Sequence, residues 1–307
     1  MGIASRRTRA AVATAALVLG AASAGADPAG FAFLEVPAGA HASAMGGAYA
    51  SVADGVEAAF WNPAGLAGVR GIQLTASHFE FIEHLRHAQF GVGGRLFGGG
   101  MAATLRAMYS EPITERDALG NEIGTFGAHD LEFALAYGRA MGERLRLGGS
   151  AQVVRERLSE FAATTWALGG GATWDPAAFP RARMSVSVHN LGPAGAYQLD
   201  GARGDPVPLP TAVQAGASYG IDAAGLALRG ALETRWTRGR AGIAMLGGEL
   251  SHPSGAALRA GFRMNDETTD FSVGAGYSSA ALRLDYAFVP FRLELGDTHR
   301  LSLSAQF

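Results

Sequence analysis

The 307-residue chain contains no cysteine and few charged residues. The absence of cysteine excludes disulfide bonds, thiolate chemistry and cysteine-ligated zinc sites. Charged residues make up 17% of the chain, whereas soluble domains average about 25%. The 25 basic and 27 acidic residues nearly balance. This balance argues against a nucleic-acid partner, which would need a basic face.

Long hydrophobic runs are also missing. After the first residues, no stretch of about twenty apolar residues occurs, so no transmembrane helix is expected. Glycine, in contrast, is abundant: its 44 residues are roughly twice the average share. Sheets with tight turns tolerate this much glycine better than helical bundles do. The composition therefore favours a β-rich protein.

Residues 1–26 have the pattern of a secretory signal peptide. Three arginines precede an apolar stretch at residues 10–20, and small residues at 24–26 form the expected cleavage site. The apolar stretch is short for a permanent anchor helix, which is the alternative interpretation. No cysteine follows the cleavage site, so a lipoprotein is excluded. We therefore expect export through the Sec pathway.

Residues 27–68 form the part of the mature chain without strand alternation, and we expect a compact plug or hatch segment there. Its composition is rich in Ala and Gly. Residues 40–49 and 52–60 could each form a short helix, the second capped by Asp54 and stopped by Pro63. This segment is predicted to lie inside or beneath the mouth of the structure that follows.

Residues 69–307 divide into about fourteen alternating runs of roughly ten residues. The last run, 297–307, places Leu301 and Leu303 on one face and Arg300 and Ser302 on the other. A soluble sandwich could also end on such a strand. However, an even number of runs, with long links at one end and short turns at the other, is typical of outer-membrane barrels. We predict an all-β fold: a transmembrane antiparallel up-and-down β-barrel with a short N-terminal helical plug.

Two stretches resemble the PorV/PorQ family of outer-membrane proteins. Residues 42–67 read A-S-A-M-G-G-A-Y-A-S-V-A-D-G-V-E-A-A-F-W-N-P-A-G-L-A, and residues 284–303 read L-D-Y-A-F-V-P-F-R-L-E-L-G-D-T-H-R-L-S-L. H-N-L-G-P at 189–193 and D-P-V-P-L-P at 205–210 resemble the middle loop of that family. The N-P-A-G motif is also similar to the hatch motif of FadL-type long-chain fatty acid transporters.

The resemblance implies a fourteen-stranded barrel in the outer membrane of a Gram-negative bacterium. PorV/PorQ-type proteins serve type IX secretion, so it also implies a non-enzymatic component that binds a large translocon or secreted cargo proteins. The alternative is a FadL-like channel with a hydrophobic ligand in its lumen. In both cases outer-membrane lipid is a partner, and neither cofactor nor metal is expected. An outer-membrane enzyme is disfavoured because no nucleophile, base and orienting group occur together.

The plug motif is the first candidate site, and it comprises Trp61, Asn62, Pro63, Ala64 and Gly65. It could be a hinge or latch, because Pro63 fixes one dihedral angle and Gly65 can adopt positive φ. A structural turn after a helix explains the same residue types and is favoured.

The closing-strand motif is the second candidate, and it comprises Asp297, Thr298, His299, Arg300 and Phe307. His and Asp so close together could suggest acid–base chemistry. No serine elbow and no H-E-x-x-H motif accompany them. A polar strand entry with Arg300 in the lumen is therefore the favoured interpretation.

A set of charged residues falls on the polar faces of the predicted strands. These lumen charges are Arg95, Arg106, Glu132, Arg146, Arg229, Glu233, Arg259, Arg263, Arg283 and Asp285. They could form an anion-favouring pore, but an ion-pair network that fills a narrow lumen is favoured, since buried charges need partners. His78, His84 and His87 could bind a metal weakly, although a solvated loop is the better interpretation.

Overall fold

The computed structural model describes residues 30–80, 85–199, 202–292 and 296–307. The predicted signal peptide at 1–26 and His84 lie outside these residues. Fourteen antiparallel strands form one closed barrel, as the sequence predicts. Its strands are β1 (Gln73–Glu80), β2 (Arg86–Leu96), β3 (Gly99–Tyr109), β6 (Ala128–Met141), β7 (Leu145–Leu158), β8 (Phe161–Trp174), β9 (Ala182–Leu191), β12 (Ala212–Ala223), β13 (Leu226–Thr237), β14 (Ile243–Ser251), β15 (Ala256–Met264), β16 (Phe271–Ser278), β17 (Leu282–Pro290) and β18 (Asp297–Gln306).

The barrel closes where its last strand meets its first. β18 pairs with β1 from Gln73 opposite Gln306 to Phe79 opposite Arg300. Just beyond this pairing, the main chains of Ile72 and Phe307 exchange hydrogen bonds of 3.2 and 2.9 Å. Closure leaves the cylinder with no free sheet edge, which is the condition for strands to cross a lipid bilayer.

The period-two pattern of the sequence corresponds to the two faces of the wall. Leu301, Leu303 and Phe133 face outward and are about half exposed, with fractions of 54%, 50% and 51%. Arg300 and Ser302, on the opposite face of β18, are 2% exposed inside the barrel. An apolar exterior around a polar interior is the arrangement of a transmembrane β-barrel.

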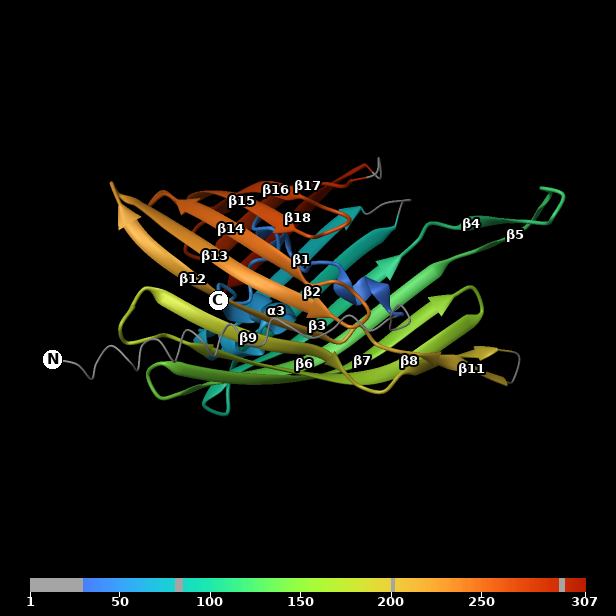
Figure 1. Cartoon of the computed structure of the whole chain (residues 1–307), viewed down its shortest axis with the longest axis horizontal. Coiled ribbons are helices and arrows are strands. Elements are labelled where there is room, and N and C mark those ends of the chain that lie inside the picture. The colour runs from blue at the N-terminus through green and yellow to red at the C-terminus, as the bar shows by residue number, and fades with distance from the viewer. Residues whose placement is uncertain (1–29, 81–84, 200–201, 293–295) are drawn as a thin grey trace.

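The two ends of the barrel differ. At one end, called here the turn end, the links are short and include Phe97–Gly98 and Ala224–Gly225. At the other, the loop end, two links form hairpins of their own, namely β4 (Ile113–Arg116) with β5 (Glu122–Phe126), and β10 (Gly195–Leu199) with β11 (Ala202–Val207). The β4–β5 hairpin projects well beyond the barrel (Figure 1). The sequence predicts long links here but not the strands within them.

The seam between β8 and β9 is the irregular part of the wall. Regular pairing runs from Gly170 to Trp174 on β8, and the register shifts between Leu168 and Gly170. Asn190 on β9 has a φ of 57°, in the left-handed region. Beyond the shift, β8 pairs with β10 through Tyr197 and Ala163 alone among the described residues.

The plug, defined here as residues 31–68, lies inside the barrel (Figure 1). It consists of five short elements: η1 (Ala32–Glu35), α2 (Ala40–Ala44), η2 (Gly55–Glu57), α3 (Ala58–Trp61) and η3 (Pro63–Gly68). No helix in the described part of the chain has the length and apolar character needed to span a membrane.

The two helices expected over 40–49 and 52–60 are wrong in extent. The first ends at Ala44, because Gly46 and Gly47 adopt φ values of 66° and 81° that a right-handed helix excludes. In place of the second, a 3-10 turn begins at Gly55, where φ is 64°, and the α-helix begins only at Ala58. As expected, Asp54 caps that turn by accepting a 2.8 Å hydrogen bond from Gly55 N.

Candidate functional site

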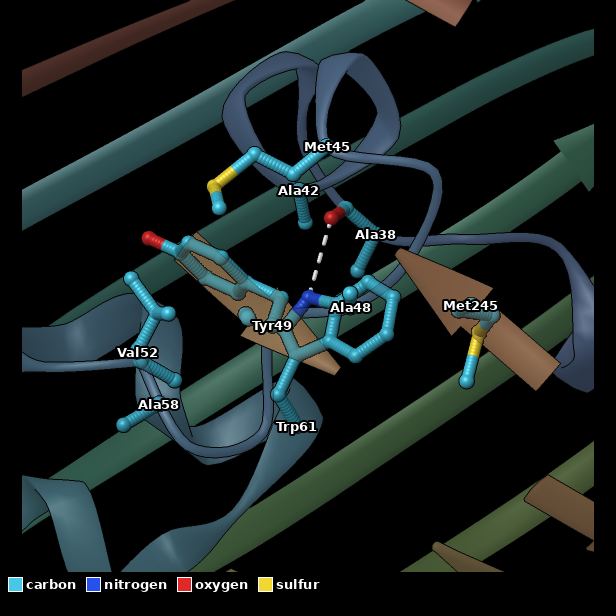
Figure 2. Packing of buried hydrophobic residues seen from close by; sticks show 11 residues of the cluster. Ala38, Ala42, Met45, Ala48, Tyr49, Val52, Ala58, Trp61 and Met245 are labelled. Atoms are coloured by element: carbon cyan, nitrogen blue, oxygen red, sulfur yellow. Dashed lines mark hydrogen bonds between the residues drawn. The ribbon is translucent and has the colours of Figure 1, made fainter. Parts of the chain in front are cut away.

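The centre of the plug is an aromatic and methionine core. Trp61 packs edge-on against Tyr49, with ring centroids 5.7 Å apart, and its indole Nε1 donates a 3.0 Å hydrogen bond to the Ala38 carbonyl. Met45 and, from β14 of the wall, Met245 complete the core (Figure 2). The core fixes the fold of the plug because its side chains come from segments far apart in the plug sequence.

The N-P-A-G segment rests on a row of inward-facing glycines. A Cβ at Gly148 would come within 2.3 Å of the Pro63 carbonyl carbon, and one at Gly138 within 2.2 Å of the Pro63 oxygen. A Cβ at Gly100 would come within 1.9 Å of the Leu66 oxygen. Only glycine lets the plug backbone approach the wall this closely. These wall glycines are part of the site that sequence reasoning missed.

Asn62 connects the plug to the irregular seam. Its Nδ2 donates to the carbonyl oxygens of Ala172 on β8 and Val186 on β9, at 3.2 and 3.4 Å. These two wall residues face each other across the seam. Its Oδ1 accepts from Ala64 N at 3.1 Å, which organises the turn. A latch between plug and wall would need contacts of this kind. That the N-P-A-G segment moves stays a prediction.

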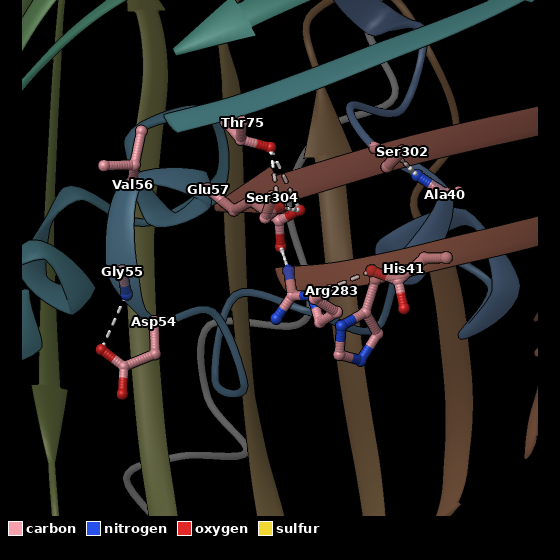
Figure 3. A network of polar contacts seen from close by, with 12 residues as sticks. Ala40, His41, Asp54, Gly55, Val56, Glu57, Thr75, Arg283, Ser302 and Ser304 are labelled. Carbon is pink, nitrogen blue, oxygen red and sulfur yellow. Dashed lines mark hydrogen bonds and ion pairs between the residues drawn. The ribbon is translucent and has the colours of Figure 1, made fainter. Parts of the chain in front are cut away.

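A closed ring of seven polar side chains joins the plug to the part of the barrel wall opposite the β8–β9 seam. Three members come from the plug and four from strands β14, β15 and β17. In order around the ring they are His41, Glu249, Arg259, Asp285, Arg283, Glu57 and Tyr49. The separations that join neighbours include 2.8 Å for His41–Glu249, 2.8 Å for Arg259–Asp285 and 3.0 Å for Tyr49–Glu57. Arg283 and Glu57 are seen in direct contact in Figure 3.

Glu57 is the plug carboxylate in this ring. Burial by itself would raise its pKa, but the charges of Arg283 and His41, with hydrogen bonds from Arg283 and Tyr49, lower the pKa to about 2. The free side chain has a value of 4.5. Glu57 is therefore ionised at neutral pH and holds the plug through its charge.

Other predicted lumen charges also contact the plug. Glu233 accepts from the backbone amides of Ala50 and Ser51 at 3.0 and 2.7 Å. Arg106 pairs with Glu132 at 3.0 Å and donates to the Leu34 carbonyl at 3.0 Å. These contacts lie between the wall and the plug, and the network interpretation stays a prediction.

The remaining members of that set lie nearer the rims. Arg263 donates to Gly46 O at 2.8 Å and pairs with Asp266. Arg146 pairs with Asp175 near the turn end, at 2.7 Å. Arg95 and Arg229 are exposed on β2 and β13, so they lie outside the buried network.

The closing-strand motif is divided between the two faces of β18. Arg300 faces inward, donates to Ser43 Oγ at 2.9 Å and lies 4.3 Å from the ring centroid of Phe79. Thr298 also faces inward and is buried, whereas Asp297 is exposed at the loop end. His299 faces outward, where its Nδ1 lies 2.8 Å from the Tyr286 hydroxyl. The motif therefore does not form one constellation.

Phe307 is 76% exposed and contributes its main chain to closure. His87 differs from the solvated-loop interpretation: it is fully buried and stacks on Phe79, with centroids 4.8 Å apart. It lies on the inward face of β2, whereas His78 is exposed on β1. Among the described residues, no group of three or more His, Asp or Glu side chains is placed to hold a metal ion.

A packed cluster of buried apolar side chains, called here the apolar chamber, lies at the loop end of the lumen. Its walls are Met108, Val154, Ala163, Ala167 and Leu209, all buried. Phe31, Phe33 and Leu34 of the plug fill it. Phe31 has a φ of 55°, an uncommon conformation for a bulky residue. Sequence reasoning did not single out these residues, although two phenylalanines and a leucine so close together in the plug were a usable signal.

Polar cavities lie below the chamber. A cavity of about 30 Å³ separates the plug from the wall beside Arg106, Gln214 and Arg235, which is room for very few water molecules. A larger cavity of about 550 Å³ opens beside the plug at the turn end and is lined by Glu57, Arg146 and Arg283, among others. The plug and its polar ring separate the apolar chamber from this lower cavity.

No family model matches the sequence, and none of the curated proteins matches it either. Solved structures do resemble the fold. The CymD monoaromatic hydrocarbon channel is 14% identical, covers 89% of this chain and 98% of its own, and superposes with a TM-score of 0.60. The Pseudomonas putida toluene transporter TodX is 14% identical, with coverages of 88% and 98% and a TM-score of 0.61.

A Pseudomonas aeruginosa FadL homologue is 13% identical, covers 89% of this chain and 98% of its own, and has a TM-score of 0.55. At these identities the likeness establishes a shared fold, a fourteen-stranded barrel with a short helical segment before it. The similar structures named here are channels or transporters, or a homologue of one, rather than enzymes.

Proposed function

We propose that this protein is an outer-membrane channel for hydrophobic small molecules in a Gram-negative bacterium, exported through the Sec pathway. The observation that carries the proposal is the apolar chamber at the loop end. Phe31 and Phe33 pack against wall side chains that would also suit an apolar ligand of similar size, once the two rings have moved away. Aromatic side chains of the chain itself therefore stand where a small aromatic compound would bind.

The fold supports the same proposal. The similar structures include a toluene transporter and a monoaromatic hydrocarbon channel. The plug closes the lumen with a polar network, so a ligand must displace part of it in order to pass. We infer that entry at the loop end exchanges the plug side chains of the chamber for the ligand.

Dye displacement tests the proposal. The purified full-length barrel is titrated with an environment-sensitive naphthylamine dye, and toluene is then added as competitor. We expect saturable binding that toluene reverses. Val154→Trp should abolish binding by filling the chamber, because Val154 is fully buried in its wall. Val153→Trp is the matched control, because the neighbouring Val153 faces outward and is 53% exposed.

Equal dye binding by both variants would contradict the chamber as the ligand site. Absence of toluene competition in the wild-type protein would contradict the hydrocarbon class. Heat-modifiable migration in gel electrophoresis verifies that each variant forms a closed barrel.

A second proposal is the PorV/PorQ-type role, in which the barrel binds a secretion translocon or secreted cargo. The sequence resemblance supports it, and the β4–β5 hairpin offers a projecting surface with Ile113 and Ile123 exposed. A mild-detergent pull-down from the native bacterium separates the two proposals. A very large barrel or a cargo protein in the eluate would favour secretion, whereas a bound hydrophobic compound would favour transport.

A further inference from the structure

Two arginines stand on the outward face of β7 at the loop end. Arg155 and Arg157 are exposed and, two residues apart on one strand, project from the same face of the sheet. Arg157 lies opposite His129 of β6, which is also exposed and faces outward. Charged side chains on the outer face of a barrel are costly at mid-membrane but not near its boundaries.

The register places this pair at the boundary of the apolar band. On the turn-end side, Trp174 lies opposite Leu145 and Tyr137 opposite Gly149, so an aromatic girdle crosses β7 near Leu147. The ten residues from there to Arg157 span about 33 Å along the strand at roughly 3.3 Å per residue. A strand tilt of about 40° reduces this to about 25 Å along the membrane normal, the height of a typical apolar band.

The surface just below the pair is suited to acyl chains. Val153 and Trp166 lie opposite each other across β7 and β8 and are each 53% exposed. Leu131, which is opposite Arg155, is 46% exposed. Basic side chains therefore lie at the membrane boundary, directly next to a continuous apolar surface. A lipid molecule has the same order, with its charged headgroup at the boundary and its acyl chains below.

Within the described part of the chain, no ion pair joins Arg155 or Arg157 to an acidic side chain. Glu156 lies between the arginines in sequence but on the inward face, where it bonds to Tyr197. Glu160 lies beyond the pair in the β7–β8 turn. Arg157 Nε donates to the Ser159 carbonyl at 2.8 Å, a contact that leaves its charge uncompensated. Arg86, also at the loop end, is in contrast ion-paired with Glu111.

We propose that Arg155 and Arg157 bind the phosphate of an anionic lipid in the leaflet at the loop end. Its acyl chains lie over Val153 and Trp166. Guanidinium groups suit this partner because they form charge-assisted, forked hydrogen bonds with phosphate oxygens. The lipid-binding proposal depends on the proposed membrane location of the barrel, but it does not depend on the proposed transport of hydrophobic compounds.

Fluorescence quenching by brominated lipids tests the proposal at Trp166. The full chain, with Trp174 and Trp236 replaced by Phe so that Trp166 and the buried plug residue Trp61 remain, is reconstituted in neutral phosphatidylcholine vesicles. Brominated phosphatidylglycerol or brominated phosphatidylcholine is added in increasing fractions. Because Trp166 lies beneath the arginines, bromines on a bound lipid quench it efficiently. We expect the anionic lipid to quench at roughly tenfold lower mole fraction than the neutral lipid, given two basic side chains near the surface.

The variant pair R155Q/R157Q should remove this preference and leave quenching by the neutral lipid unchanged. R139Q/R144Q is the matched control, since it removes the same charge from the same two-strand region at the turn end and should keep the preference. Equal quenching by both lipids in the parent protein would overturn the proposal, as would a preference that survives in R155Q/R157Q. Dye binding in the apolar chamber, measured on the same samples, reports the transport proposal separately.

Discussion

Gly148 on β7 and Pro63 in the plug are in backbone contact, so close that a Cβ on Gly148 would lie 2.3 Å from the Pro63 carbonyl carbon. The atom that a Cβ would meet belongs to the main chain and cannot rotate away. The fit between plug and wall at this point therefore depends on the absence of a side chain at Gly148.

Gly148→Ala should displace the plug or destabilise the barrel. An overpacked contact of this kind costs about 2 kcal/mol or more, and thermal unfolding of the purified protein in detergent measures it. Gly230→Ala is the control, because a Cβ at that strand position meets no described atom within 4 Å. Equal melting temperatures for both variants would contradict the close contact.

Asn62→Ala should loosen the plug from the β8–β9 seam. The change removes two donated hydrogen bonds to the wall and leaves the carbonyls of Ala172 and Val186 without these donors. We expect a cost of about 1–3 kcal/mol and more frequent conducting openings in planar bilayers. Asn121→Ala removes an asparagine from the exposed β4–β5 turn and should change neither quantity. Identical recordings from both variants would argue against a latch at Asn62.

Glu57→Gln and Arg283→Gln should each destabilise plug docking, and together they should cost less than the sum. Glu57→Gln leaves Arg283 with Asp285 as its remaining carboxylate partner, and Arg283→Gln leaves the partly buried Glu57 without its arginine, which costs up to about 3 kcal/mol. Unfolding free energies of the parent, both single variants and the double variant form a cycle that isolates their coupling. A coupling energy near zero would mean that the ring contributes no cooperativity.

The pH dependence of plug docking should follow Glu57. Its pKa in the folded protein, about 2, lies below the 4.5 of the free side chain. The ionised carboxylate therefore contributes its full stabilisation above about pH 4.5 and loses it as the pH falls towards 2. We expect the barrel to stay closed in planar bilayers at pH 5 and to open progressively below about pH 4. In Glu57→Gln this acid-dependent component should be absent, and an unchanged pH profile would contradict the assignment.

The barrel could be predicted from the sequence because its signal is local. Alternation along each strand, as in Leu301 to Ser304, follows directly from one face meeting lipid and the other the lumen. Arg106, Glu233 and Arg259, which lie on the polar faces of this alternation, are buried in the structure. The number of strands follows from counting such runs.

The plug and its contacts could not be predicted in the same way. Its conformation depends on positive φ values at Gly46, Gly47 and Gly55, which permit but do not require a turn. The partners of Glu57 and His41 lie more than two hundred residues away in sequence, at Arg283 and Glu249. Nothing in the local pattern identifies which of several inward arginines would meet which carboxylate. The inward burial of His87 could not be predicted because the residue lies at the boundary between the first long loop and the strand that begins with Arg86.

The order of the chain has a consequence for how this molecule is assembled. The plug precedes β1, whereas Glu249, Arg259, Arg283 and Asp285 of the polar ring belong to the last strands. Once β18 has paired with β1, the strands of the wall surround the plug without a free edge at this junction. A plug that is in place before this closure can form its ion pairs with the last strands as they are added. The last strands then pair around the plug. Their charged side chains complete the polar ring only when the plug is correctly positioned.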